Sequence, residues 1–311
     1  MIPDYVERLL VDIENTVKII KELGLKIETV YIGGGTPTTL NENQLYRLLD
    51  KIGKCVDINS LAEFTVEAGR PDTINAEKMS ILKSAGVTRV SVNAQTMNAD
   101  VLKTIGRHHT PEDFLRAYEA ARVSGIRDIN VDLIAGLPGE NLESFVSSVD
   151  KIVSLDPSNI TVHTFYVKRA AELAKRDLSV CRAEDETVRS SVSYADSALL
   201  SAGYLPYYLY RQKNTAANLE NTGFAKKDHE GLYNIYMMEE VHTVFGAGAS
   251  AMTKFVSPKA DEMKIVRISE TKYPYEYLDG TKSTAEMRYT ELRCAAMEFY
   301  GMNGDVEDFR K

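Results

Sequence analysis

The sequence predicts an α/β protein: a partial TIM-type (β/α)6 barrel that lacks its first strand, followed by a smaller α+β region. Strand-like and helix-like segments alternate about five times over residues 1–166, which is typical of βαβ units around a parallel sheet. The chain starts on a helix, whereas a barrel of this kind places a strand before that helix. The alternation stops near residue 180, so we predict a barrel domain over residues 1–180 and an α+β region over residues 181–311.

Local patterns predict the elements in order. From residue 3 to residue 23, apolar side chains recur at helical spacing, which predicts an amphipathic helix. The β-branched and aromatic run at 28–32 predicts a buried strand. Asn41, followed three residues later by Gln44, predicts a capping box at the start of a helix that ends near residue 53.

The later segments continue this pattern. Strands are predicted at 63–67, 89–93, 128–134 and 160–166, and helices at 75–84, 98–105, 111–124 and 142–155. The C-terminal region is predicted to contain a long helix at 183–201 and strand-like segments at 204–210 and 263–269.

Composition argues against several classes of protein. The chain has 311 residues, 44% of them hydrophobic and 26% charged, as in ordinary globular proteins. A formal net charge of −8, without a basic run longer than two residues, argues against nucleic acid as a partner. No run of about 18 apolar residues and no signal-peptide pattern is present, so we predict a cytoplasmic protein with no membrane partner.

The cysteines and histidines do not form a metal motif. The three cysteines, Cys55, Cys181 and Cys294, are too far apart for metal-ligand or redox spacing, and an odd count suits a reducing compartment. His108 and His109 are adjacent, so on regular structure they point apart. We therefore predict no metal site made by this chain's own residues.

Three successive glycines, Gly33–Gly35, directly follow the strand predicted at 28–32. Parallel α/β folds bind ligands at the carboxyl ends of strands, and glycine lets the backbone approach a small molecule closely. Thr36 adds a hydroxyl, and Pro37 fixes the exit of the loop. The alternative is a tight strand-to-helix turn that is merely rich in glycine, and the loop alone leaves both interpretations open.

Polar residues follow the later predicted strands in the same way: Glu67, Asn93 with Gln95, Asp132, and the segment 163–166 that contains His163. Carboxylates and an amide that converge there suit a ligand with an ammonium group and ribose hydroxyls. Arg107, in the loop after a helix, is placed to pair with a ligand carboxylate. Singly, each residue has a structural alternative, such as helix capping by Asp132, but their series at successive strand ends favours a site.

Several motifs resemble those of radical S-adenosylmethionine (SAM) enzymes. The run Tyr-Ile-Gly-Gly-Gly-Thr-Pro-Thr at 31–38 resembles their methionyl-amine-binding loop. The segments 89–95, 105–108 and 130–139 resemble the oxygen-independent coproporphyrinogen III oxidases and their relatives. The segments 65–74 and 210–221 are similar to the coproporphyrinogen dehydrogenase branch called HemZ, and the resemblance extends over almost the whole chain.

This resemblance implies that the protein binds SAM, in two molecules. The positions that match the family's methionyl contacts are Gly34, Gly35 and Thr36, with Glu67 at the first SAM. The positions that match the contacts of the second SAM are Gln95, Arg107 and Asp132. Tyr166 and Met252 fall at the next contact positions by spacing alone.

One family feature is missing from the sequence. The family holds a [4Fe–4S] cluster with a Cys-x₃-Cys-x₂-Cys loop after the first barrel strand, and none of this chain's cysteines matches that loop. The loop is expected just before Met1, where the first strand is also missing. An N-terminal truncation or a fragmentary gene product accounts for both, and we therefore expect this chain to be inactive alone.

The resemblance implies an oxidoreductase of haem biosynthesis, which converts coproporphyrinogen III to protoporphyrinogen IX by oxidative decarboxylation of two propionates. Arg169, Arg211 and Lys213 are our candidates for binding this anionic porphyrinogen substrate. Three alternatives stay open: a haem-binding or haem-trafficking relative without decarboxylase activity, an inert pseudo-enzyme with a residual SAM pocket, and an unrelated phosphate-binding barrel enzyme.

Overall fold

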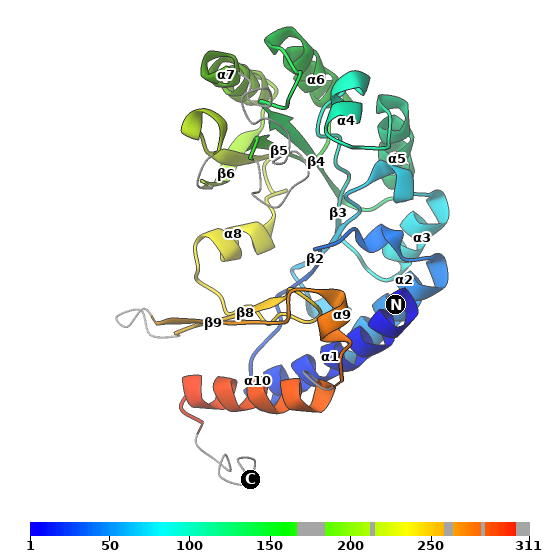
Figure 1. The fold of residues 1–311 in the computed structure, drawn as a ribbon, viewed down its shortest axis with the longest axis vertical. Coiled ribbons are helices and arrows are strands. Elements are labelled where there is room, and N and C mark those ends of the chain that lie inside the picture. Colours follow the sequence, from blue (N-terminus) through cyan, green and yellow to red (C-terminus); the bar gives the residue numbers. More distant parts are fainter. Residues whose placement is uncertain (167–183, 212–214, 258–263, 281–283, 303–311) are drawn as a thin grey trace. The chain divides into compact units, whose positions relative to one another are not determined.

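The computed structural model describes residues 1–166, 184–211, 215–257, 264–280 and 284–302 (Figure 1). The chain divides into two compact units. One, which we call the helical unit, comprises Met1–Val30, Leu40–Ala62 and Glu239–Lys311. The other, the sheet unit, comprises Tyr31–Thr39 and Glu63–Met238. The boundary predicted at residue 180 lies outside the described residues.

The sheet unit is built on a curled, seven-stranded half-barrel sheet with strand order β1-β2-β3-β4-β5-β7-β6 (Figure 1). The strands are β1 (Thr29–Ile32), β2 (Glu63–Glu67), β3 (Arg89–Ser91), β4 (Asp128–Ala135), β5 (Asn159–Thr164), β6 (Leu205–Tyr210) and β7 (Asn221–Ala225). Pairs β2–β3, β3–β4 and β4–β5 are parallel, whereas β7 runs antiparallel to both β5 and β6. The predicted partial barrel is therefore confirmed.

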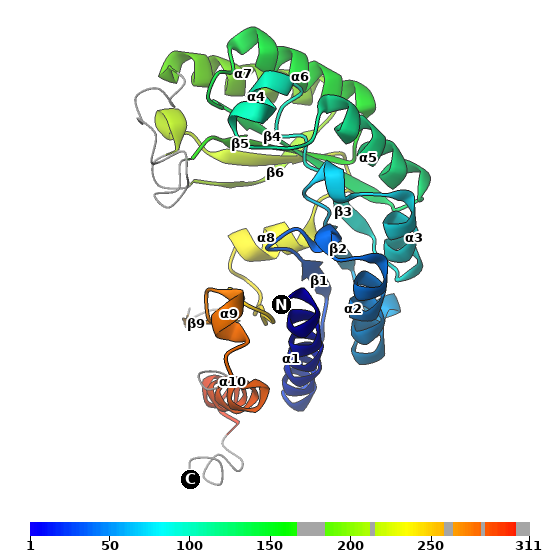
Figure 2. The ribbon, with the colours of Figure 1, turned by 45° about the vertical axis from the view of Figure 1, so that its right-hand side comes forward.

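Helices cover one face of this sheet. They are α3 (Ala76–Ser84), α4 (Ala99–Thr104), α5 (Pro111–Val123), α6 (Leu142–Leu155) and α7 (Asp185–Ser201), while the short α8 (Leu232–Met238) lies on the opposite face (Figure 2). Along β4, the buried Val131 and Leu133 alternate with the partly exposed Asn130 and Asp132. Because successive side chains of a strand point to opposite faces, the apolar set forms the core and the polar set shares the other face.

The helical unit contains α1 (Ile2–Glu22), α2 (Glu42–Cys55), α9 (Pro274–Tyr277) and α10 (Ala285–Phe299), with the antiparallel pair β8 (Met252–Val256) and β9 (Ile265–Ser269). The predicted capping box is present, because Asn41 accepts from the Gln44 N–H and the Gln44 side chain accepts from the Asn41 N–H. Ile19, Phe255 and Leu292 form a buried core between α1, β8 and α10.

The elements predicted over residues 1–166 are confirmed to within a few residues at each end. β6 was predicted as part of an appended region, but it joins the main sheet through β7. β7 was not predicted, because Asn221 and Gly223 in its sequence Asn-Thr-Gly-Phe-Ala are residue types that are depleted in strands. The backbone of Gly223 in β7 leaves room for the Tyr208 ring, since a Cβ there would lie 1.9 Å from a ring carbon.

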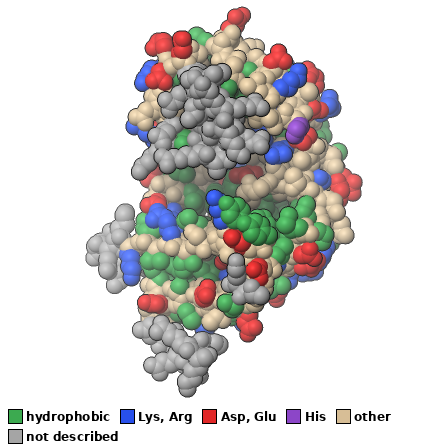
Figure 3. All heavy atoms as spheres, viewed as in Figure 1, with side chains coloured by type: hydrophobic (Ala, Val, Ile, Leu, Met, Phe, Trp, Pro, Cys, Tyr) green, Lys and Arg blue, Asp and Glu red, His purple; other side chains and the backbone are tan. Residues whose placement is uncertain are grey.

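No helix among the described residues is long and apolar enough to span a membrane. On the face drawn in Figure 3, acidic and basic side chains are interspersed among the described residues.

Candidate functional site

The glycine loop after β1 closes over the side chains of Tyr31 and Glu67. A Cβ on Gly33 would lie 2.6 Å from the Tyr31 Cε1 atom and 3.0 Å from the Glu67 Cδ atom, so no larger residue fits without displacing them. Gly34 has φ +96°, a backbone conformation that favours glycine. A Cβ on Gly34 or Gly35 would meet no atom within 4 Å, so the loop backbone faces open space. The loop therefore combines a packed side with a side open to a ligand.

Glu67, at the carboxyl end of β2, is held by two hydrogen bonds. The Tyr31 hydroxyl donates to its Oε1 atom, and the Gly34 N–H donates to the carboxylate. Burial raises the pKa of Glu67 above the ordinary value of a glutamate; the hydrogen bond from Tyr31 opposes this rise, and the charge of Asp132 adds to it. This coupling shows that the two predicted carboxylates face one region.

Asp132, on β4, is set in a polar network. Asn130 donates to its Oδ1 atom at 2.7 Å, and the His163 Nε2 atom lies 3.7 Å from its Oδ2 atom. Burial raises the pKa of Asp132. Hydrogen bonds from His163, Asn130 and Thr161, together with the charge of His163, lower it by more. The pKa of Asp132 therefore lies below the ordinary value of an aspartate. The site thus contains one carboxylate with a lowered pKa, Asp132, and one with a raised pKa, Glu67.

Gln95 joins this region through its backbone. Its φ is 65°, its N–H donates to the Asp132 carbonyl at 2.8 Å, and its carbonyl accepts from the Ile134 N–H at 2.9 Å. The residue is only 5% exposed. A left-handed backbone at a non-glycine residue is costly, and such conformations cluster at functional sites.

Arg107 and Thr36 approach the same end of the sheet. Burial and the charge of Arg70 lower the pKa of Arg107, while the charges of Asp72 and Asp132 oppose this. Arg107 therefore lies within electrostatic range of Asp132. A Cβ on Gly69, just after β2, would lie 3.7 Å from the Thr36 hydroxyl, so Thr36 lies against the loop that follows Glu67.

The remaining predicted site residues are Tyr166, Met252 and the three substrate candidates. Tyr166 follows β5 and forms an isolated bridge with Thr215. Met252 begins β8 in the helical unit and is 49% exposed. Arg211 forms an ion pair with Glu220 and is exposed. Arg169 and Lys213, the other two substrate candidates, lie outside the described residues.

Sequence reasoning missed several polar partners of the site. Tyr31 and Tyr233 stack with ring centroids 4.1 Å apart, and Asn130 and Thr161 support Asp132. Strand alternation places Asn130 on the same face as Asp132, so their contact could have been predicted from the sequence. The approach of Tyr233 to Tyr31 could not have been predicted, because no local pattern joins residues so far apart in the sequence.

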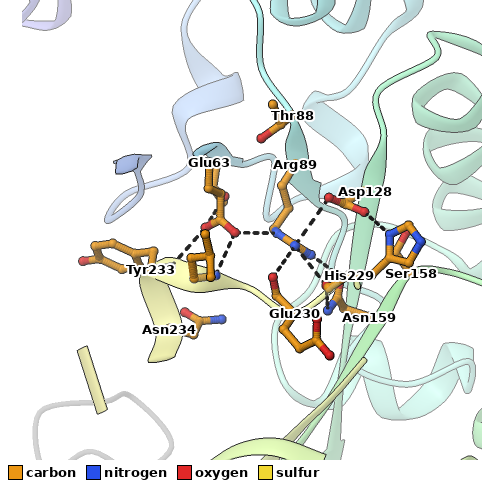
Figure 4. Close-up of polar contacts among 12 residues, drawn as sticks. Glu63, Thr88, Arg89, Asp128, Ser158, Asn159, His229, Glu230, Tyr233 and Asn234 are labelled. Atoms are coloured by element: carbon orange, nitrogen blue, oxygen red, sulfur yellow. Dashed lines mark hydrogen bonds and ion pairs between the residues drawn. The ribbon is translucent and has the colours of Figure 1, made fainter. Parts of the chain in front are cut away.

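The amino ends of the strands carry a second polar network (Figure 4). Figure 4 shows the buried Arg89 side chain between Glu63 and Asp128, with its Nε atom 3.2 Å from a Glu63 oxygen and its Nη2 atom 3.4 Å from an Asp128 oxygen. Arg89 also donates to Asn159 and to the backbone carbonyls of residues 229 and 230. The amino-terminal face of a barrel contributes to stability, so we assign this network to the stability of the fold.

The described residues contain acceptors for a small ligand but no metal-binding cluster. They contain no group of three or more His, Cys, Asp or Glu side chains able to hold a metal ion. Cys55 and Cys294 are free thiols on α2 and α10. The open glycine backbone, Glu67 and Asp132 instead offer acceptors for an ammonium group and for hydroxyls.

Comparison with known proteins shows the family to which this chain is similar. Residues 1–152 match the family model of the radical SAM superfamily. The chain is 40% identical over 259 residues to the oxygen-independent coproporphyrinogen-III oxidase-like protein HemZ of Bacillus subtilis, over 83% of this chain and 51% of that protein. It is 34% identical over 299 residues to the haem chaperone HemW of the same organism, over 93% of this chain and 74% of that protein.

A solved structure shows the same fold. The coproporphyrinogen III oxidase HemN from Escherichia coli, described as a radical SAM enzyme, matches 95% of this chain and 69% of its own chain with a TM-score of 0.67 at 19% identity. The chain therefore shares the HemN fold, while it spans about half the length of the HemZ protein.

Proposed function

Because this chain belongs to the radical SAM superfamily, among the relatives of HemZ and HemW, we propose that its strand-end site binds S-adenosylmethionine. The observation that carries this proposal is the convergence of the glycine loop, Glu67 and Asp132 at one end of the sheet. SAM carries an ammonium group, a carboxylate, a sulfonium and ribose hydroxyls. The site offers carboxylate acceptors, free backbone groups and an arginine, which match those groups.

We assign the groups of SAM to residues as follows. The Glu67 carboxylate accepts from the ammonium group, and the backbone of Gly34, Gly35 and Thr36 lies along the methionyl portion. Asp132 is the acceptor for ribose hydroxyls of a second SAM, which Gln95 and Arg107 border. The low pKa of Asp132 supports this assignment, because an ionised carboxylate is the stronger acceptor.

Radical SAM proteins use SAM together with a [4Fe–4S] cluster, which supplies the electron that cleaves it. The described residues do not fit such a cluster, because their two cysteines lie on separate helices and no set of three ligands is present. We therefore derive no step through a cluster and limit the assignment for this chain to SAM binding.

For the whole protein, we propose the oxidative decarboxylation of coproporphyrinogen III to protoporphyrinogen IX. The 40% identity to HemZ over 83% of the chain supports this choice. The substrate is an anionic tetracarboxylate, so its recognition requires cations near the site. Among our candidates for that role, Arg211 lies within the described residues and forms an ion pair with Glu220. Substrate binding at Arg211 would therefore replace this ion pair.

A haem chaperone is the second candidate. HemW of Bacillus subtilis matches 93% of this chain and 74% of its own length, a fuller overlap than the 51% of HemZ. Haem titration of the whole protein separates the two: a spectral shift without formation of a vinyl product favours the chaperone, and vinyl product from coproporphyrinogen III favours the oxidase.

Calorimetric titration of this chain with SAM tests the binding site. We expect saturable binding that weakens at least tenfold in Glu67→Gln and in Asp132→Asn, because each change removes a charged acceptor. Glu143→Gln, at an exposed carboxylate on α6, is the matched control and leaves the affinity unchanged. Absence of SAM binding by a folded wild-type chain would refute the proposal.

A further inference from the structure

Two tyrosines from distant parts of the sheet unit, Tyr31 and Tyr233, stack beside the Glu67 carboxylate. Their ring centroids are 4.1 Å apart and their planes are inclined by 16°. The Tyr31 hydroxyl donates to Glu67 Oε1. Burial raises the pKa of Tyr31, and the charge of Glu67 adds to the rise, so this hydroxyl stays protonated and remains a donor.

The glycine loop is shaped around this pair. The missing Cβ of Gly33 leaves the space that the Tyr31 ring and the Glu67 carboxylate occupy, since a Cβ would lie 2.6 Å from the ring. The Gly34 N–H donates to the same carboxylate. A carboxylate has about four acceptor positions. The loop and Tyr31 occupy two of them, which leaves others for a ligand on the open side of the loop.

The backbone at Tyr233 is held by hydrogen bonds to the Glu63 carboxylate. Tyr233 is the second residue of α8, and the N–H groups of Leu232 and Tyr233 donate to the Glu63 carboxylate at 2.9 and 3.3 Å. Arg89 fixes that carboxylate at 3.2 Å, as Figure 4 shows. The network at the amino ends of the strands therefore sets the place of the Tyr233 ring.

We propose that Tyr31 and Tyr233 form an aromatic clamp that orients the Glu67 carboxylate for the ammonium group of SAM. This inference rests on the proposed SAM site and adds two positioning residues to it. Tyr31 acts through its hydroxyl, which restrains Glu67. Tyr233 acts through its ring, which restrains Tyr31, so the first turn of α8 contributes to a site formed by β1 and β2.

Calorimetric titration with SAM between pH 5.5 and 8.5 tests the clamp. Tyr31→Phe keeps the ring but removes the donor, so we expect about tenfold weaker binding at the acid end. The hydrogen bond from Tyr31 lowers the pKa of Glu67, so its loss moves the acid limb of the binding profile to higher pH. Tyr233→Ala frees the Tyr31 ring and is expected to shift the limb in the same direction.

Tyr207→Phe is the matched control. The Tyr207 hydroxyl accepts from Asn234 on α8 at 3.3 Å, so the variant disturbs the same helix without touching Glu67, and we expect no change in the profile. An unchanged profile in Tyr31→Phe and Tyr233→Ala, with wild-type SAM binding intact, overturns the clamp. Equal weakening in Tyr207→Phe also overturns it, because the effect then reflects the fold of α8. Failure of the wild type to bind SAM refutes the proposed function instead.

Discussion

At the scale of single residues, the space left at Gly33 decides how Tyr31 and Glu67 meet. A Cβ there would lie 2.6 Å from the Tyr31 ring and 3.0 Å from the Glu67 carboxyl carbon. Both neighbours are restrained, the ring by its stack on Tyr233 and the carboxylate by two hydrogen bonds. Neither can yield without loss of a contact that supports the site.

Gly33→Ala is therefore expected to weaken SAM binding at least tenfold and to destabilise the fold by about 1–3 kcal/mol, as overpacking does. Calorimetric titration and urea unfolding measure the two effects. Gly53→Ala is the control: Gly53 lies inside α2 with its nearest neighbour, Ile58, at 4.0 Å, so this variant is expected to gain up to about 1 kcal/mol from helix propensity. Wild-type affinity in Gly33→Ala would show that the contact with Glu67 is not needed.

Glu140, between β4 and α6, makes the fold sensitive to pH. It is 7% exposed, its Oε1 atom accepts from Thr96 at 2.5 Å, and its Oε2 atom has no hydrogen-bond partner. Burial raises the pKa of Glu140 to about 7. Between the ordinary value of 4.5 and about 7, the folded state therefore holds more protons than the unfolded state, and stability falls as pH rises across that window.

The free energy of unfolding falls by about 3 kcal/mol in total across this pH window, since each pKa unit corresponds to about 1.4 kcal/mol. Glu140→Gln has no carboxylate to ionise, so we expect it to be more stable than the wild type at pH 8 and similar to it at pH 4.5. Urea unfolding at a series of pH values measures this, with Glu143→Gln, at the exposed neighbour on α6, as the control. Parallel stability profiles for wild type and Glu140→Gln would contradict the assignment.

At the scale of elements, a buried ion network joins the amino ends of β2, β3 and β4 to the segment before α8. Arg89 lies within 3.2 Å of Glu63 and 3.4 Å of Asp128, and it donates to the backbone carbonyls of residues 229 and 230 at 3.0 Å. All three charged side chains are at least 94% buried. Removing Arg89 alone would leave the Glu63 carboxylate without its ion-pair partner, while Asp128 would keep its contacts with Arg127 and His229.

Arg89→Met is accordingly expected to cost about 3–5 kcal/mol of stability, the usual penalty for breaking a buried ion pair on one side. Arg122→Met removes an exposed arginine on α5, which pairs with Glu119, and is expected to cost less than about 1 kcal/mol. Urea unfolding of both variants measures the difference. Similar midpoints for the two would mean that the network contributes specificity and not stability.

At the scale of the whole molecule, the sequence predicted the parallel part of the sheet because its signals are local. The alternating burial of β4 and the capping box of Asn41 and Gln44 are both readable within a few residues. The insertion of β7 between β5 and β6 could not be predicted from local sequence, because it depends on the fit of the Tyr208 ring over Gly223.

The candidate site likewise contains residues that could be predicted from local sequence and one that could not. Glu67, Asp132 and Arg107 were predicted from their places after strands and helices, and the structure brings Glu67 and Arg107 each within electrostatic range of Asp132. Tyr233 was missed because its approach to Tyr31 depends on the Glu63–Arg89 network, which links residues that are distant in sequence.

The composition of the ligand set bears on what this chain does with SAM. The glycine loop, Glu67 and Asp132, which the proposed SAM site uses, all lie in the sheet unit. A [4Fe–4S] cluster needs three thiolates close together. The described cysteines, Cys55 and Cys294, lie on α2 and α10, and the third, Cys181, is 113 residues before Cys294 in the sequence.

We therefore expect this chain to bind SAM without cleaving it. After anaerobic incubation with iron, sulfide and dithionite, liquid chromatography with mass spectrometry should detect intact SAM and no 5′-deoxyadenosine. A radical SAM enzyme that holds its cluster, treated in parallel, provides the positive control. Formation of 5′-deoxyadenosine by this chain would mean that its own residues complete a cluster site, and cysteine-to-serine variants would then identify the ligands.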